Sequence, residues 1–299
     1  MMPPFIDASA ERHLDWIALT DALAAGHSLP RAEIGDTFLY RDPDTLLSRA
    51  AWIDGLGSLV KTATIFPENV GPTINGAVSL FSDTDGTLAA MLDFHLLTKW
   101  KTAGDSLLAA RRLARRDART ILIVGSGTVA ASLRAAYGAA FPEARFLVWS
   151  RATENARAFA DGRNCEAVTD LAGAVGAADI VTCATMATEP VIEGEWLKPG
   201  QHLDLIGAYR PDMREADDAA LRRGRIFVDS RETTFDHIGE LKIPLSTGAI
   251  DRDDVIADFY DLDRFDRSDD DITVFKNGGG AHLDLICARY ILDAVEGAK

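Results

Sequence analysis

The sequence is poor in cysteine and lacks any pattern of cysteines that would bind metal or build a disulfide framework. Its 299 residues contain three cysteines, Cys165, Cys183 and Cys287, at wide and irregular spacing. Cys183 falls in a predicted strand and Cys287 in a predicted helix, so buried structural thiols are expected. We therefore predict a protein with no metal site, in a reducing and cytoplasmic setting.

Positive charge is also scarce, and long apolar runs are missing. Lysine and arginine number 31 against 46 acidic residues, which gives a net charge of −15. This balance argues against nucleic acid or an anionic membrane as a partner. No run approaches membrane-spanning length, and no basic segment followed by an apolar one opens the chain. An anionic cofactor or substrate would need a locally basic pocket.

What is present is an order of elements typical of an α/β protein with two domains. Residues 118–277 alternate strands and helices, which predicts a Rossmann, doubly wound sheet. Residues 1–117 combine helices with short strands and a hairpin around Asp83–Gly86, which predicts a second, α+β domain. The acid-rich stretch 251–271 is interpreted as a solvated surface with helical turns. The strands predicted for the Rossmann domain are Thr120–Val124, Phe146–Trp149, Glu166–Val168, Ile180–Cys183, His202–Leu205, Ile226–Val228 and Ile272–Phe275.

The most informative segment is a glycine fingerprint between a strand and a helix. The apolar run Ile121–Val124 leads into Gly125-x-Gly127-x-x-Ala130, followed by an alanine-rich helical pattern. Gly125 permits a tight turn, and Gly127 lets the backbone approach a pyrophosphate, which the helix N-terminus favours. Strand, turn and helix in this order predict a dinucleotide site. The residues expected to contact the pyrophosphate are Gly125, Ser126, Gly127 and Thr128.

The end of the next strand indicates which dinucleotide binds. NAD sites usually carry an acidic residue there, whereas Ser150 and Arg151 occupy the position in this chain. A guanidinium would pair with a 2′-phosphate, so NADP(H) is preferred over NAD(H), which stays possible. The alternative is that Ser150 caps a helix and Arg151 is solvated.

Several segments in order carry a family resemblance. They are L-S-R-A around Arg49, V-K-T-A-T-I-F-P-E-N from Val60, L-T-K-W-K-T-A-G at 97–104, V-T-C-A-T-M-A-T-E-P at 181–190, I-G-A-Y-R-P-D-M-R-E at 206–215, V-D-S-R-E at 228–232 and I-T-V-F-K-N-G-G at 272–279. With the fingerprint, they make the chain similar to the ornithine cyclodeaminase/mu-crystallin family. The resemblance implies a homodimer whose first domain, with residues 278–299 returning to it, binds substrate and dimerises.

The resemblance also implies a clamp of cations for the carboxylate of a small amino or imino acid. By position these are Arg49, Lys61 and Lys101, where the family usually has arginine in place of Lys101. Lysine offers a point charge rather than a planar fork, so this exchange is not conservative. The alternative is that Arg49 and Lys61 are strand residues that point into solvent. Further departures are Val129, where many members have glutamine, and Asn277-Gly278-Gly279, which replaces a serine-containing turn.

Tyr209 distinguishes two chemistries. Cyclodeaminases of the family carry an aspartate there, whereas Tyr209 followed by P-D-M-R-E is similar to the ketimine and pyrroline-2-carboxylate reductases. Reduction of an imine requires less acid–base catalysis from the protein than loss of ammonia does. The sequence therefore predicts reduction, with Lys61 and Tyr209 as catalytic residues. Asp204 and Asp212 could supply a carboxylate instead, and Asp229 is expected to anchor a loop. The remaining residues predicted to contact the cofactor are Thr102, Val129, Ala184, Thr185, Met186 and Gly207.

Three other functions stay open from sequence. The first is an ornithine cyclodeaminase that recycles NAD within each turnover. The second is an alanine dehydrogenase-like enzyme, and the third is an NADPH-dependent binder of small ligands without catalysis. Ammonia release from ornithine would identify the first, and ligand binding without turnover the third.

Overall fold

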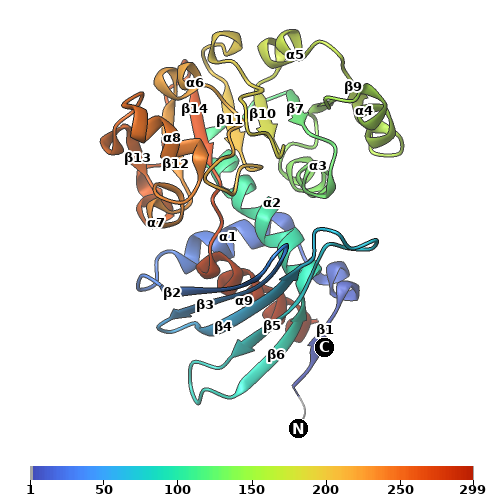
Figure 1. Cartoon of the computed structure of the whole chain (residues 1–299), viewed down its shortest axis with the longest axis vertical. Coiled ribbons are helices and arrows are strands. Elements are labelled where there is room, and N and C mark those ends of the chain that lie inside the picture. Colours follow the sequence, from blue (N-terminus) through green and yellow to red (C-terminus); the bar gives the residue numbers. More distant parts are fainter. Residues whose placement is uncertain (1–2, 299) are drawn as a thin grey trace. The chain divides into compact units, whose positions relative to one another are not determined.

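The structure is a computed structural model that describes residues 3–298, and the chain divides into two compact units. The first comprises Met1–Gly104 and Gly280–Lys299, and the second Asp105–Gly279. The sequence placed the boundaries at 117/118 and 277/278. The first division falls earlier because one continuous helix, α2 (Phe94–Leu113), begins in the first unit and ends in the second (Figure 1).

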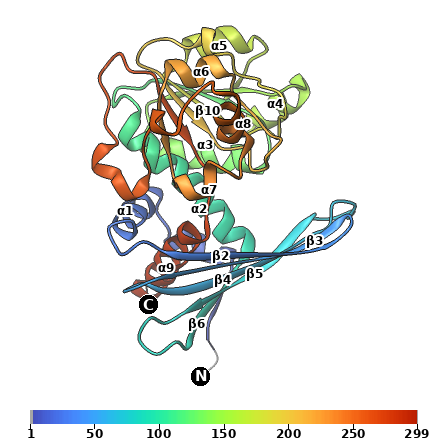
Figure 2. The ribbon, with the colours of Figure 1, turned by 60° about the vertical axis from the view of Figure 1, so that its left-hand side comes forward.

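The first unit is a six-stranded sheet with helices. The strand order is β1-β6-β5-β4-β3-β2, in which β2 to β6 form an antiparallel meander and β1 pairs with β6 in parallel. Figure 2 shows β2 and β3 running out past helix α9. The elements are β1 (Phe5–Ile6), η1 (Ala8–His13), α1 (Trp16–Gly26), β2 (Glu33–Arg41), β3 (Asp44–Ile53), β4 (Gly57–Ile65), β5 (Ile74–Phe81), β6 (Leu88–Asp93) and α9 (Ala281–Gly297).

The second unit is an eight-stranded parallel sheet with helices. Its order is β13-β12-β14-β11-β10-β7-β8-β9. The strands are β7 (Thr120–Val124), β8 (Arg145–Trp149), β9 (Glu166–Ala167), β10 (Ile180–Cys183), β11 (His202–Leu205), β12 (Arg225–Val228), β13 (Val255–Ala257) and β14 (Thr273–Lys276). The helices are α3 (Thr128–Ala140), α4 (Thr153–Ala160), α5 (Leu171–Ala177), η2 (Gly194–Trp196), α6 (Asp218–Arg223), α7 (Arg231–Thr234), α8 (Gly239–Thr247), η3 (Arg252–Asp254) and η4 (Phe259–Arg264).

The strand order creates a switch point beside β7. The chain runs outward through β8 and β9 and then returns to β10 on the other side of β7. Ligands of such sheets bind outside the carboxyl ends of the strands where the order reverses. The central strands β7 and β10 are buried, apart from the partly buried Thr120 at the start of β7, and mostly apolar, as parallel strands covered on both faces are.

The predicted fold class is confirmed, and most predicted elements occur within a few residues of their predicted bounds. The buried position predicted for Cys183 and Cys287 is also confirmed. The interpretation of residues 251–271 was wrong in part, because β13 forms inside that stretch and pairs with β12. Helices α7 and α8 were not predicted, and α8 includes Pro244, which usually signals a helix end.

Candidate cofactor and substrate sites

The glycine fingerprint forms the tight turn that was expected. Gly125 has a φ of +119°, and a Cβ on it would lie 2.6 Å from the carbonyl oxygen of Ala184. Its N–H donates to the carbonyl oxygen of Trp149 at 2.8 Å, and Ser126 Oγ lies 3.1 Å from Ser150 Oγ. The turn after β7 is therefore fixed against the ends of β8 and β10, and only glycine fits at its first position.

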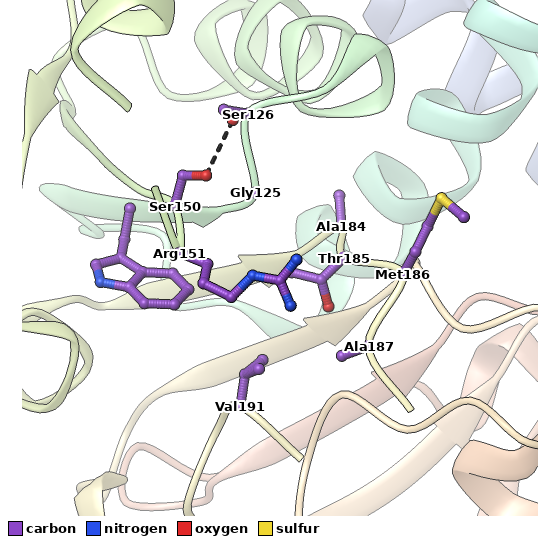
Figure 3. Close-up of a pocket in the computed structure, with 10 residues that line it drawn as sticks. Gly125, Ser126, Ser150, Arg151, Ala184, Thr185, Met186, Ala187 and Val191 are labelled. Carbon is purple, nitrogen blue, oxygen red and sulfur yellow. Dashed lines mark hydrogen bonds between the residues drawn. The ribbon is translucent and has the colours of Figure 1, made fainter. Parts of the chain in front are cut away.

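A pocket of about 250 Å³ opens at these three strand ends. Figure 3 shows the side chain of Arg151 extending from the end of β8 into it. Trp149 supplies an apolar ring, and Thr185 contributes a hydroxyl from the loop after β10. The ten lining residues are Gly125, Ser126, Trp149, Ser150, Arg151, Ala184, Thr185, Met186, Ala187 and Val191. A basic side chain thus occupies a mostly apolar hollow at the switch point, which suits an anionic dinucleotide.

The other residues predicted to contact the cofactor are less tightly grouped. Gly127 is the N-cap of α3, and Thr128 begins that helix beside a second, shallow hollow. Val129 is exposed, and Gly207 follows the end of β11. Thr102 lies on α2 in the first unit and does not line either hollow.

The predicted carboxylate clamp lies within the first unit. Arg49 on β3 and Lys61 on β4 are directly paired in the antiparallel register, so their side chains leave the sheet on the same face. Lys61 is 8% exposed and shares the buried side of β4 with Leu59 and Ala63. The alternative of a solvent-facing lysine is therefore wrong for Lys61. Lys101 on α2 is 7% exposed.

Two of these cations have carboxylate partners. Lys61 Nζ donates to Asp284 Oδ1 at 3.0 Å and lies 4.8 Å from the centre of the Phe94 ring. Arg49 Nη2 donates to Asp36 Oδ2 at 2.7 Å. The side chain of Lys101 has no hydrogen bond or ion pair with any residue from 3 to 298.

The cations are close enough to affect one another. Burial lowers the pKa of Lys61, the carboxylate of Asp284 opposes this, and repulsion from Lys101 and Arg49 lowers it further. Three cations facing two carboxylates leave one positive charge in excess. A buried excess charge is costly unless an anion offsets it, so the cluster is suited to bind a carboxylate.

Asp284 is the residue that the sequence failed to reveal. It lies in the first turn of α9, where it is 1% exposed among Ala281, Leu285 and Ala288. An aspartate on the apolar face of an amphipathic helix is unusual, because buried carboxylates need partners. That mismatch was the available signal, but nothing in the sequence points to Lys61 as its partner.

The aspartates considered as alternative proton carriers are all engaged elsewhere. Asp212 is exposed and pairs with Arg210 at 3.0 Å. Asp204 is buried and accepts hydrogen bonds from three hydroxyl groups. Asp229 accepts from the backbone N–H of Gly278 at 2.8 Å, so it holds the loop after β14, whereas the sequence predicted that it anchors the loop after its own strand. Tyr209 itself is 57% exposed in the turn after β11.

Comparison with known proteins identifies the family. The sequence profile described as the ornithine cyclodeaminase/mu-crystallin family matches residues 58–299. The chain belongs to this family. A Delta(1)-pyrroline-2-carboxylate reductase of Paracoccus denitrificans is 50% identical, over 99% of this chain and 98% of its own. The ketimine reductase mu-crystallin of Mus musculus is 34% identical, over 76% of this chain and 72% of its own.

Solved structures of the family have the same fold. Thermococcus litoralis Delta(1)-pyrroline-2-carboxylate reductase, in complex with NADH and L-proline, superposes with a TM-score of 0.89. It is 23% identical and covers 99% of this chain and 98% of its own. A probable ornithine cyclodeaminase from Bordetella pertussis gives a TM-score of 0.87 at 27% identity, over 100% and 98%. The ornithine cyclodeaminase/mu-crystallin fold therefore extends over the whole chain. Among the described residues, no helix is long and apolar enough to cross a membrane.

Proposed function

We propose that this chain is an NAD(P)H-dependent imine reductase. It reduces a small cyclic α-imino acid, of the pyrroline-2-carboxylate or piperideine-2-carboxylate type, to the L-amino acid. The observation that carries the proposal is the buried cation cluster with its unpartnered Lys101. The 50% identity to a pyrroline-2-carboxylate reductase over nearly the full chain supports the choice of substrate class.

The cation cluster would bind and orient the substrate carboxylate. Lys101 offers a free ammonium, while Arg49 and Lys61 are held in place by Asp36 and Asp284. When bound, the reduced nicotinamide supplies a hydride to the imine carbon. The imine nitrogen must gain a proton to become the amine. Lys61 is suited to donate it, because its lowered pKa makes the ammonium more acidic than that of a lysine in water.

NADP(H) is the preferred cofactor in this proposal, and NAD(H) remains usable. Arg151 projects into the pocket at the end of β8, and Ser150 lies beside it, where an acidic residue would select NAD. Arg151→Ala should weaken NADPH binding by about tenfold, as expected for loss of a charge-assisted pair, and leave NADH binding nearly unchanged. Equal losses for both cofactors would remove the support for NADP(H).

Imine reduction is favoured over cyclodeamination because no carboxylate occupies the position of Tyr209. The nearest acidic residue in the chain, Asp212, is paired with Arg210. Ornithine cyclodeamination and an alanine dehydrogenase-like reaction are outcomes that the same assays would detect. A protein that bound ligands without turnover would show neither activity.

A homodimer is part of the proposal. Exposed apolar side chains gather on β2 and β3 of the first unit, namely Phe38, Leu39, Tyr40, Leu46 and Trp52. Exposed apolar patches of this kind mark association surfaces. A structural neighbour is described as an archaeal alanine dehydrogenase dimer with bound NAD. The three free thiols are consistent with a reducing, cytoplasmic setting.

The test is NADPH and NADH oxidation with pyrroline-2-carboxylate and piperideine-2-carboxylate, beside an ammonia assay with L-ornithine. Oxidation that depends on the imine, without ammonia from ornithine, supports the proposal. Ammonia from ornithine without net cofactor consumption would replace it with cyclodeamination. If neither cofactor oxidation nor ammonia release were detected, a binder of small ligands without catalysis would be favoured.

Substitutions of the three cations test whether they bind the substrate. Arg49→Ala, Lys61→Ala and Lys101→Ala should each lower kcat/KM by at least about tenfold, with cofactor affinity little changed. Lys99→Ala is the matched control. Lys99 lies on α2, as Lys101 does, and pairs with Glu11 on a partly exposed surface. If the three clamp variants behaved like Lys99→Ala, the clamp assignment would be wrong.

A further inference from the structure

Glu215 is a buried carboxylate that the steps above do not use. It is fully buried in the segment that leads to α6. Its Oε1 accepts from Thr185 N at 2.7 Å and from Thr185 Oγ1 at 2.9 Å. Its Oε2 accepts from Gly207 N at 2.6 Å and from Ala208 N at 3.2 Å. One side chain therefore receives four hydrogen bonds from the two loops that follow β10 and β11.

The backbone around Glu215 holds the rest of the same pocket wall. The N–H groups of Val191 and Ile192 both donate to the carbonyl oxygen of Glu215 at 2.9 Å, and Arg214 N donates to Ala187 O at 2.9 Å. Thr185, Ala187 and Val191 all line the cofactor pocket. The shape of the wall from 184 to 191 thus depends on the Glu215 segment.

The loops after β10 and β11 are in close contact where Glu215 joins them. A Cβ on Gly207 would lie 2.0 Å from the carbonyl oxygen of Thr185 and 2.6 Å from Glu215 Oε1. Lys276 Nζ holds the second loop from another side, donating to Leu205 O at 2.9 Å and to Ala208 O at 2.8 Å. The loop that ends at Ala208 leads directly into Tyr209, so its position also fixes the start of the Tyr209 turn.

A carboxylate is chemically required at this point. Its two oxygens accept up to about four hydrogen bonds, whereas a glutamine amide has one accepting oxygen and an NH₂ that would face N–H donors. A second buried carboxylate lies beside it: Glu240 accepts from the backbone N–H groups of Glu215 and Ala216 at 2.7 and 3.0 Å. The ammonium of Lys276 and the guanidinium of Arg214 are the buried cations nearby. Such buried charge is costly, and its cost is offset only if the hydrogen bonds are satisfied.

We propose that Glu215 is a positioning residue for the cofactor: its ionised carboxylate holds the loops after β10 and β11 in the shape that receives the dinucleotide. This inference rests on the proposed function, in that a dinucleotide binds the pocket of the second unit. Glu215 does not line the pocket and acts through Thr185 and the loop at Gly207.

The surroundings of Glu215 make this role sensitive to pH. Burial raises the pKa of its carboxyl to about 7; the ammonium of Lys276 opposes the rise and the carboxylate of Glu240 adds to it. The other groups facing this site are Cys183, whose buried thiol has a pKa well above its ordinary value, and Arg214. Protonation would place an O–H against N–H donors and loosen the two loops. One pH unit below a pKa of 7, about nine-tenths of the carboxyl is protonated, so NADH affinity should fall by up to about tenfold between pH 8 and 6.

The experiment measures the NADH dissociation constant by nucleotide fluorescence at about pH 6 and pH 8, since NADH lacks a 2′-phosphate that titrates in this range. Glu215→Gln should weaken NADH binding by at least about tenfold at pH 8 and remove the pH dependence. Asp204→Asn is the matched control. Asp204 is also a fully buried carboxylate in this unit, accepting from Ser106, Tyr137 and Thr182, but it touches neither loop. It should keep both the wild-type affinity and the wild-type profile.

The outcomes separate this inference from the proposed function. If the wild type did not bind NADH or NADPH at all, the proposed function itself would fail. If the wild type bound NADH and Glu215→Gln bound it equally, with the same profile, only the role of Glu215 would be overturned. If Glu215→Gln did not fold, Thr185→Val decides, because it removes one of the four hydrogen bonds to Glu215 and keeps the carboxylate; an NADH affinity equal to that of the wild type would contradict the role.

Discussion

The Lys61–Asp284 pair is expected to contribute both to the stability of the fold and to the binding of a substrate carboxylate. Replacing the two residues singly and together separates these contributions. The pair is 3.0 Å long, and both side chains are at least nine-tenths buried. Removing one partner of a buried pair leaves an uncompensated charge and costs about 3–5 kcal/mol. Asp284→Leu should lower the free energy of unfolding by that amount. Lys61→Met should lower it by less, because the positive charge of Arg49 still acts on Asp284 when Lys61 is removed.

The double variant should recover most of this loss. Replacing a buried ion pair by apolar residues of similar volume is often neutral, so Lys61→Met with Asp284→Leu is expected within about 2 kcal/mol of the wild type. It should still fail to bind a carboxylate ligand such as L-proline, because the cluster has lost a cation. Stability returns and ligand binding does not.

Urea denaturation followed by tryptophan fluorescence is the assay. Trp16 and Trp100 stack at 3.9 Å between ring centres within the same unit, so they report on its unfolding. Ligand binding is measured on the same samples by calorimetry. If either single variant cost less than about 1 kcal/mol, or if the double variant lost as much as the two singles together, the pair would not be the buried, coupled pair described here.

Three further predictions concern the second unit. Gly207→Ala should lower the free energy of unfolding by more than about 3 kcal/mol, since the new Cβ would lie 2.0 Å from Thr185 O. Gly127→Ala is the control and should leave the free energy of unfolding nearly unchanged, because a Cβ there meets open space. Burial lowers the pKa of His202 from 6.5 to about 3, so neutral His202 stabilises the fold above pH 6.5, and this contribution is lost as the pH falls toward 3. The wild type should lose stability on acidification more steeply than His202→Asn, by up to about 1.4 kcal/mol per pH unit, and parallel curves would refute this. Tyr209→Asp should lower imine reduction and raise ammonia release from L-ornithine; an unchanged ammonia rate would show that this side chain does not decide the chemistry.

Much of the fold could be predicted because its local signals agree with its tertiary structure. The parallel strands β7 and β10 are short runs dominated by apolar residues, and in β4 of the first unit buried residues alternate with less buried ones. Strand β13 was not predicted because its three residues are held by pairing with β12 rather than by a pattern of their own. Helix α8 was not predicted because Gly239 and Pro244 disfavour helix locally, and burial of its apolar residues compensates.

The candidate sites divide in the same way. The cofactor pocket follows from strand ends and a glycine turn, which are local features of the sequence. The partners of the clamp do not, because Lys61 and Asp284 are separated by 223 residues and nothing local relates them. Glu215 and Lys276 were likewise invisible as a group, since each is an ordinary charged residue until the fold buries both.

The division of the chain also sets the order in which the protein can be completed during synthesis. The nucleotide-binding unit, 105–279, is one continuous segment, whereas the first unit needs both residues 1–104 and helix α9. Domains fold largely as units as they emerge from the ribosome. The second unit can therefore form while the sheet of the first still lacks α9, which packs on β3 and β4 and carries the carboxylate that pairs with Lys61. Until α9 emerges, the sheet face that holds Lys61 stays uncovered, so aggregation of nascent chains should depend on how soon residues 280–299 follow.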